Sequence, residues 1–177
     1  MSQKWAFIDE SKASSYILVA SVVLARKLTE TRKTMMSLRM KGQPRTHFRK
    51  ESDRRRRLLL SAIAELDLSH FVVTSKTNFG LQEARARCLE MLVGQLCSAG
   101  VKNIVFESDA SQNPLDRKVL SKITQGLEAQ DKVDFAHELP NDEPLLWIAD
   151  AIAWSINRGG EWERRVKQLN LKAQNLG

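Results

Sequence analysis

The hydrophobic and polar positions along the chain predict five strands. Short apolar runs rich in β-branched or aromatic residues, and bounded by polar or turn residues, are typical of buried strands. Such runs cover residues 5–9, 16–24, 70–74, 103–107 and 133–136. Because only a turn at residues 12–15 separates the first two, we expect them to form an antiparallel hairpin.

Apolar positions spaced three and four residues apart predict helices between these strands. The helices cover residues 29–40, 52–66, 81–99, 114–127 and 144–158, and an amphipathic, charged tail follows at 161–169. Gly100 is suited to end the third helix and Pro144 to begin the fifth. Residues 46–50 are expected to be a connector, with a brief strand as the alternative.

The order of these elements predicts an α/β fold with a mixed sheet flanked by helices. Strands and helices alternate in the second half, which indicates parallel strands joined by crossover helices, and the opening hairpin adds an antiparallel part. A chain of 177 residues without a linker or internal repeat is expected to form one domain over residues 1–177. Within it, we expect a basic helical insertion at about 26–66 and a helical tail at about 160–177.

Positive charge is concentrated in the insertion. Residues 26–57 contain thirteen Lys or Arg and three acids, a local net charge of +10, whereas the whole chain carries +7, so the remainder is at −3. A basic patch of this kind attracts phosphate backbones, although it can also be a solvated face that keeps a protein soluble. The residues predicted to contact nucleic acid are Arg45, His47, Arg49, Lys50, Arg54 and Arg55.

Several other classes of protein lack support in the sequence. No apolar run reaches membrane-spanning length and the first residues do not resemble a signal peptide, so we expect a cytoplasmic protein with no membrane partner. Cys88 and Cys97 lie nine positions apart and suggest free thiols, and no zinc-ligand spacing occurs. Glycine-rich phosphate loops and the GxSxG serine elbow are also absent from the sequence.

Four acidic residues stand where apolar segments end, or inside one. Asp9 closes the first strand, Glu107 and Asp109 close a later strand, and Asp150 lies on the apolar stripe of the last predicted helix. If the two strands are neighbours, their acidic ends meet at one edge of the sheet, where ligands of α/β proteins usually bind. Burying lone carboxylates costs several kcal/mol, so chains that gather them usually supply cations.

This pattern predicts a catalytic and metal-binding set made of Asp9, Glu107, Asp109 and Asp150. Two divalent cations about 4 Å apart, bridged by carboxylates, can activate a water and stabilise the leaving oxygen of a phosphodiester. Each acid also has a structural alternative. Asp9 can form an Asx turn, Glu107 or Asp109 can cap the following turn, and Asp150 can pair with a buried arginine.

Two of these acids lie in segments that resemble a known family. Phe7-Ile8-Asp9-Glu10-Ser11 and Ile148-Ala149-Asp150-Ala151-Ile152-Ala153 resemble the two signature motifs of an uncharacterised bacterial and phage family, a domain of unknown function with a ribonuclease H-like fold. The order of elements is also similar to ribonuclease H, from residue 4 to about 157. The resemblance implies a ribonuclease H-like mixed sheet and a two-metal phosphodiesterase site that uses Mg²⁺ or Mn²⁺.

The chain departs from the family pattern at two points. Lys12 stands where the family usually has glycine, and only Glu83 and Glu90 are available for the helix glutamate of ribonuclease H, neither of them in a recognisable motif. The choice between Glu107 and Asp109 as the acid at the strand end stays open.

Two functions follow from these observations. The first is a metal-dependent nuclease acting on RNA, RNA–DNA hybrid or DNA. The second is a catalytically weak nucleic-acid-binding module, or a subunit of a defence or mobile-element complex. The sequence leaves open whether the chain forms a homo-oligomer or has a protein partner.

Overall fold

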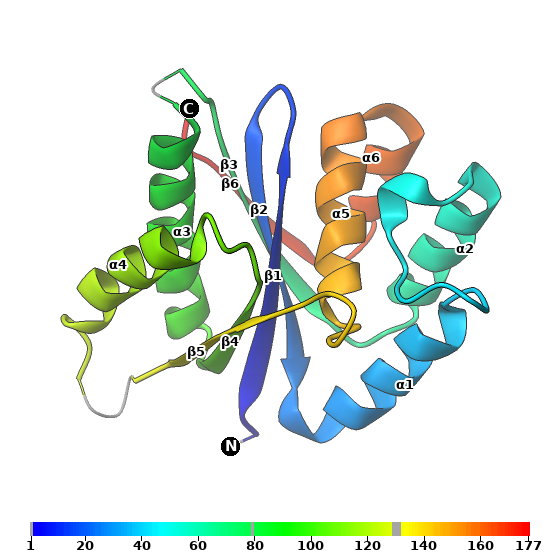
Figure 1. The fold of residues 1–177 in the computed structure, drawn as a ribbon, viewed down its shortest axis with the longest axis horizontal. Helices are drawn as coiled ribbons and strands as arrows, with labels where there is room; N and C mark the ends of the chain where they lie inside the picture. Colours follow the sequence, from blue (N-terminus) through cyan, green and yellow to red (C-terminus); the bar gives the residue numbers. More distant parts are fainter. Residues whose placement is uncertain (1, 79, 129–131) are drawn as a thin grey trace.

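A mixed sheet forms the centre of the computed structural model, which describes residues 2–78, 80–128 and 132–177 (Figure 1). Its six described strands are arranged in the order β5-β4-β1-β2-β3-β6. They comprise β1 (Lys4–Lys12), β2 (Tyr16–Leu24), β3 (Ser69–Ser75), β4 (Val101–Glu107), β5 (Asp134–Glu138) and β6 (Leu171–Asn175). The α/β fold with a mixed sheet is therefore confirmed.

The sheet contains both antiparallel and parallel pairs of strands. The turn after β1 is short and gives the expected antiparallel hairpin with β2, in which Asp9 lies opposite Val19. β3 is antiparallel to β2, whereas β4 runs parallel to β1 and β5 runs parallel to β4. Parallel neighbours need a crossover connection, and helices supply it here.

Helices cover both faces of the sheet. They comprise α1 (Leu28–Leu38), α2 (Asp53–Ala64), α3 (Leu81–Ser98), α4 (Asn113–Thr124), α5 (Leu146–Arg158) and α6 (Gly160–Val166), with 3₁₀ turns η1 (Ala25–Lys27) and η2 (Phe48–Lys50). In Figure 1, α3 and α4 lie on one side of the sheet, and α1, α2, α5 and α6 lie on the other. In the described part of the chain, no helix has the length and hydropathy needed to span a bilayer.

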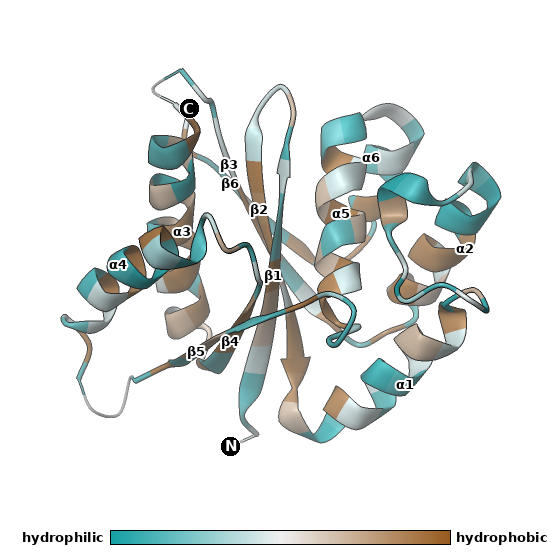
Figure 2. Ribbon diagram, viewed as in Figure 1, coloured by the Kyte–Doolittle hydropathy of each residue, from teal (hydrophilic) through white to brown (hydrophobic). Residues whose placement is uncertain are grey.

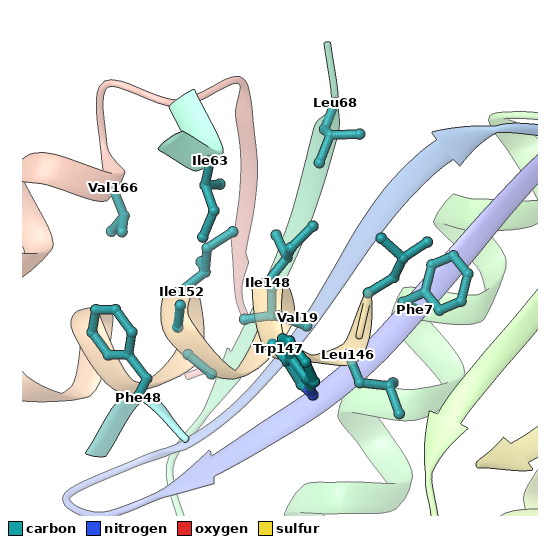
Figure 3. Close-up of a cluster of buried hydrophobic side chains, with 14 of the residues drawn as sticks. Phe7, Val19, Phe48, Ile63, Leu68, Leu146, Trp147, Ile148, Ile152 and Val166 are labelled. Atoms are coloured by element: carbon teal, nitrogen blue, oxygen red, sulfur yellow. The ribbon is translucent and has the colours of Figure 1, made fainter. Parts of the chain in front are cut away.

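Each face of the sheet has its own hydrophobic core because side chains alternate along a strand. Phe7 belongs to the core beneath α5, and Ile8 to the core beneath α3. Figure 2 shows hydrophobic residues along the centre of β2 and many hydrophilic residues in α4. Figure 3 shows how residues of α5, the strands and the insertion meet in the first core. The same alternation places Asp9 on the α5 side of the sheet and Glu10 on the α3 side.

Residues 46–50 are a connector, as expected, and the alternative of a brief strand is wrong, because Phe48–Lys50 form the 3₁₀ turn η2 and bury the Phe48 ring. The end of the chain differs from the expectation. The tail is only partly helical, since β6 adds to the edge of the sheet beside β3. The sequence of β6, LKAQN, has no apolar alternation because this edge strand is mostly exposed.

Candidate active site at the carboxyl edge of the sheet

Parallel pairing of β1 and β4 brings two of the candidate acids to one end of the sheet. Phe7 pairs with Val105 and Ile8 with Phe106, so Asp9 and Glu107 follow at the same level. α5 packs across β1 and β2 and adds Asp150 from that face of the sheet. Asp9, Glu107 and Asp150 thus line one cavity of about 330 Å³.

The carboxylates of Asp9 and Asp150 are costly to ionise. Burial raises the pKa of Asp9 well above its ordinary value, and the Asp150 charge and a hydrogen bond with Glu107 raise it further. Burial also raises the pKa of Asp150 to about 6, against the lowering effect of the hydrogen bond from the Phe48 backbone N–H. A buried and a half-buried acid with raised pKa values, together with a third acid, form the kind of environment that marks many functional sites.

The insertion between β2 and β3 contacts two of these acids. The backbone N–H of Phe48 donates to Oδ2 of Asp150 across 3.1 Å. Nη1 of Arg45 lies 3.7 Å from Oε1 of Glu107. Asp150 therefore accepts a backbone hydrogen bond, and the described residues show no ion pair between it and an arginine.

Asp109 lies at the mouth of the same cavity but has a different environment. Its Oδ1 accepts hydrogen bonds from the hydroxyl and the backbone N–H of Ser111, at 2.7 and 2.9 Å. These bonds lower the pKa of Asp109, whose side chain is exposed. Asp109 thus shapes the turn before α4, whereas Glu107 at the end of β4 interacts directly with Asp9.

The six basic candidates are divided between two hollows. Arg45, His47 and Arg49 line the cavity that contains the acids. A separate hollow of about 520 Å³ beside α2, with Met40 and Leu58 in its wall, is lined by Lys50, Arg54 and Arg55. Burial, followed by the charges of Arg45 and Lys50, lowers the pKa of His47 and so favours its neutral imidazole.

Arg55 differs from the other basic candidates because its guanidinium already has partners. It donates to the carbonyl of Leu38 and lies 3.3 Å from Oε2 of Glu51, which is buried. It helps to hold the insertion together.

The cavity wall includes three residues that the sequence did not predict there, Glu10, Arg85 and Trp154. A signal for Arg85 was present: it lies on the buried face of α3 with Cys88, Leu89 and Leu92, where a charged residue requires a partner. Glu10 gave no signal, because an acid after Asp9 looks like an ordinary turn residue.

The donor chemistry of the acids fits a hard divalent cation. Mg²⁺ and Mn²⁺ take oxygen ligands, and a cation would relieve the repulsion between Asp9 and Asp150. Among residues 2–78, 80–128 and 132–177, no three His, Cys, Asp or Glu side chains are already arranged as a metal-ligand set. The Phe48 N–H on Asp150, the Glu10 N–H on Asp9 and Arg45 beside Glu107 offset only part of the charge of these acids, since the pKa values of Asp9 and Asp150 stay raised.

Comparison with known proteins supports this architecture at the level of the fold. A chain in the structure of the PCNA:RNase HII complex from Archaeoglobus fulgidus superposes with a TM-score of 0.53 and 19% identity, over 95% of this chain and 76% of that chain. A mutant form of Bst-RNase HIII gives 0.52 and 16%, over 86% of this chain and 51% of the other. Bst-RNase HIII in complex with Mn²⁺ gives 0.52 and 15%, with the same coverage.

The chain therefore has a ribonuclease H-like fold and spans about half of the RNase HIII chains, 51% in each case. No protein-family model matches the chain, and no curated protein matches it in sequence. The resemblance to the domain of unknown function thus rests on the two short motifs alone.

Proposed function

We propose that this chain is a metal-dependent phosphodiesterase that cleaves nucleic acid. The observation that carries the proposal is the meeting of Asp9, Glu107 and Asp150 in one cavity, where loss of solvent raises the pKa values of Asp9 and Asp150. The ribonuclease H-like fold supports it, as does the presence of Mn²⁺ in one structural neighbour. Cytoplasmic nucleic acid, as RNA, RNA–DNA hybrid or DNA, is the proposed substrate.

Asp9, Glu107 and Asp150 would hold Mg²⁺ or Mn²⁺ through their carboxylate oxygens. When bound, the metal would supply an activated water and neutralise charge on the leaving oxygen. Glu107 is the proposed acid at the strand end, and Asp109 is assigned to the turn at the mouth of the cavity.

The basic wall of the cavity would bind and orient the substrate. Arg45 and Arg49 face the acids and can hold a phosphate from the other side of the cavity. Neutral His47 can donate a hydrogen bond to a phosphate oxygen without adding charge. Trp154 forms part of the cavity wall.

A panel of labelled RNA, RNA–DNA hybrid, single-stranded DNA and duplex DNA tests the proposal. We expect cleavage of at least one substrate with Mg²⁺ or Mn²⁺ and none with EDTA. Asp9→Asn and Asp150→Asn should each lower the rate at least a hundredfold, whereas Asp109→Asn is the matched control and should stay within a few-fold of wild type. Salt-sensitive binding without cleavage would instead identify a nucleic-acid-binding module.

A further inference from the structure

The hollow beside α2 combines positive charge with exposed apolar surface. Met40 and Leu58 line it, and these two side chains belong to residues that are 45% and 47% exposed. The cations Lys50 and Arg54 line the same hollow and are exposed as well. Apolar side chains beside cations suit a ligand that has both an apolar and an anionic part.

A buried ion pair holds part of the wall of this hollow in place. Glu51, the acid among the lining residues, is 6% exposed, and its Oε2 lies 3.3 Å from Nε of Arg55. The Arg55 guanidinium also donates to the carbonyl of Leu38 at the end of α1. Because Arg55 matches the charge of Glu51, Lys50 and Arg54 are left as net positive charge. In the part of the chain that the structure describes, neither of their side chains has an ion-pair or hydrogen-bond partner.

The turn η2 lies between this hollow and the cavity of the acids. Arg49 lines the cavity, and Lys50, the next residue of the same turn, lines the hollow. The α-carbons of consecutive residues are about 3.8 Å apart, so a strand of nucleic acid that contacts Arg49 passes close to Lys50. Figure 1 shows α1 and α2 on the same side of the sheet as α5, the helix that supplies Asp150.

We propose that the hollow beside α2 is a subsite for an unpaired nucleotide, so that the preferred substrate carries a single-stranded segment beside the bond that is cleaved. Lys50 and Arg54 bind the phosphate, and Met40 and Leu58 contact the base. The inference deepens the proposed function and rests on it, since it requires nucleic acid in the neighbouring cavity.

The apolar part of the wall is what selects an unpaired nucleotide. A wall of cations alone binds any phosphate backbone, whether single-stranded or duplex. In a duplex, each base is stacked between its neighbours, so its faces cannot reach an apolar side chain without the cost of unstacking. An unpaired base has a free face that Met40 and Leu58 can cover.

Fluorescence anisotropy in EDTA, in which metal-dependent cleavage is prevented, tests the subsite. The probes are a blunt RNA–DNA hybrid and a blunt DNA duplex, each also with an unpaired extension at the 5′ or the 3′ end. Blunt duplexes with the same number of phosphates as the extended probes control for the added charge. For the wild-type protein, an extension at one of the two ends should lower the Kd by roughly fivefold or more relative to this control.

Substitutions in the hollow should remove the gain from the extension. In Lys50→Ala and Leu58→Ser, we expect extended and control probes to differ by less than about twofold in Kd. Lys33→Ala and Met36→Ser are the matched controls, because both residues are exposed on α1 outside the lining of the hollow, and they should keep the gain. These side chains are exposed, so the variants should melt like wild type, and Met40→Ser replaces Leu58→Ser if that variant unfolds.

The outcomes separate the subsite from the proposed function. Equal affinity of the wild-type protein for extended and control probes would overturn the subsite, while cleavage of the blunt probes with Mg²⁺ would leave the proposed function in place. A gain that persists in both Leu58→Ser and Met40→Ser would overturn the contact with the base, and a gain that is lost equally in the control variants would overturn the assignment to this hollow. Failure of the wild-type protein to bind or cleave any probe would refute the proposed function together with the subsite.

Discussion

The backbone N–H of Phe48 donates a hydrogen bond to the carboxylate of Asp150 and so joins the basic insertion to the last helix of the site. The ring of Phe48 is almost fully buried and meets the edge of Trp154 at a centroid distance of 5.3 Å. The position of η2 and the charge of Asp150 are therefore coupled. A change at Asp150 affects both the acids and the wall that carries Arg45 and Arg49.

Asp150→Asn should stabilise the metal-free protein while it abolishes cleavage. The asparagine oxygen can still accept the Phe48 N–H, and the substitution removes a carboxylate whose pKa burial raises to about 6. The raised pKa means that the folded state binds the proton more tightly than the unfolded state, so stability falls as the pH rises from about 3.8 to about 6 and stays reduced above that. At pH 8 in EDTA, we expect urea unfolding to show a gain of about 1–3 kcal/mol.

The exposed Asp142 provides the matched control, because Asp142→Asn removes the same charge from the surface and should leave stability unchanged. A loss of stability in Asp150→Asn would contradict the view that Asp150 is an uncompensated acid. Mg²⁺ should raise the melting temperature of the wild-type protein and have little effect on Asp150→Asn.

Arg49→Ala should weaken nucleic-acid binding without affecting the fold. Its side chain is exposed at the cavity, and no partner for its guanidinium is seen in the described residues. Removing one phosphate contact should lower the slope of log K against log salt by about 1. Fluorescence anisotropy across a salt series measures this slope. An unchanged slope would show that Arg49 does not contact a phosphate of the bound nucleic acid.

Arg56→Ala, unlike Arg49→Ala, should destabilise the fold. Arg56 donates to the carbonyls of Phe48 and Arg49 at 3.1 and 2.7 Å, and its guanidinium lies 4.3 Å from the ring centroid of Trp154. These contacts hold η2 against α5, so we expect a loss of about 2–3 kcal/mol in urea unfolding. The neighbouring exposed Arg54 is the control, and Arg54→Ala should unfold like wild type.

The contrast between Arg49 and Arg56 shows where sequence reasoning reaches its limit. The polar ends of two apolar strands and the apolar stripe of a helix were sufficient to predict Asp9, Glu107 and Asp150 as site residues. These patterns can be recognised because they involve residues close together in the sequence. A basic run has the same appearance whether its side chains are solvated or packed. Arg56 gains its role from Trp154, a residue on a distant helix that the run itself does not reveal.

Glu107 and Asp109 show a second limit, at the end of a strand. Both acids share a face if the strand continues, and the sequence has no residue that marks where pairing stops. In the structure, β4 ends at Glu107 and the Asn113 side chain accepts a hydrogen bond from the Asp109 backbone N–H. β6 was missed for a related reason, since its exposed edge requires no apolar alternation.

His70, which lies on β3 outside the candidate site, should make the protein less stable as the pH decreases. It is 2% exposed on β3, and its Nδ1 lies 2.9 Å from the hydroxyl of Ser21. Burial lowers the pKa of His70 to about 4, whereas an unfolded histidine titrates near 6.5. Between these values the unfolded state binds the proton and the folded state does not, so stability is complete above about pH 6.5 and falls as pH decreases toward 4.

Over this window the wild-type protein should lose about 3 kcal/mol through His70. His70→Gln can keep a hydrogen bond with Ser21 but cannot titrate. Between about pH 7 and pH 4.5, its free energy of unfolding should therefore decrease less than that of the wild type, and the difference should be most of the about 3 kcal/mol. Urea titrations of both proteins at several pH values measure the difference, and subtraction removes the contribution of the shared carboxylates. Parallel pH profiles for the two proteins would show that His70 is protonated equally in the folded and unfolded states, which its burial argues against.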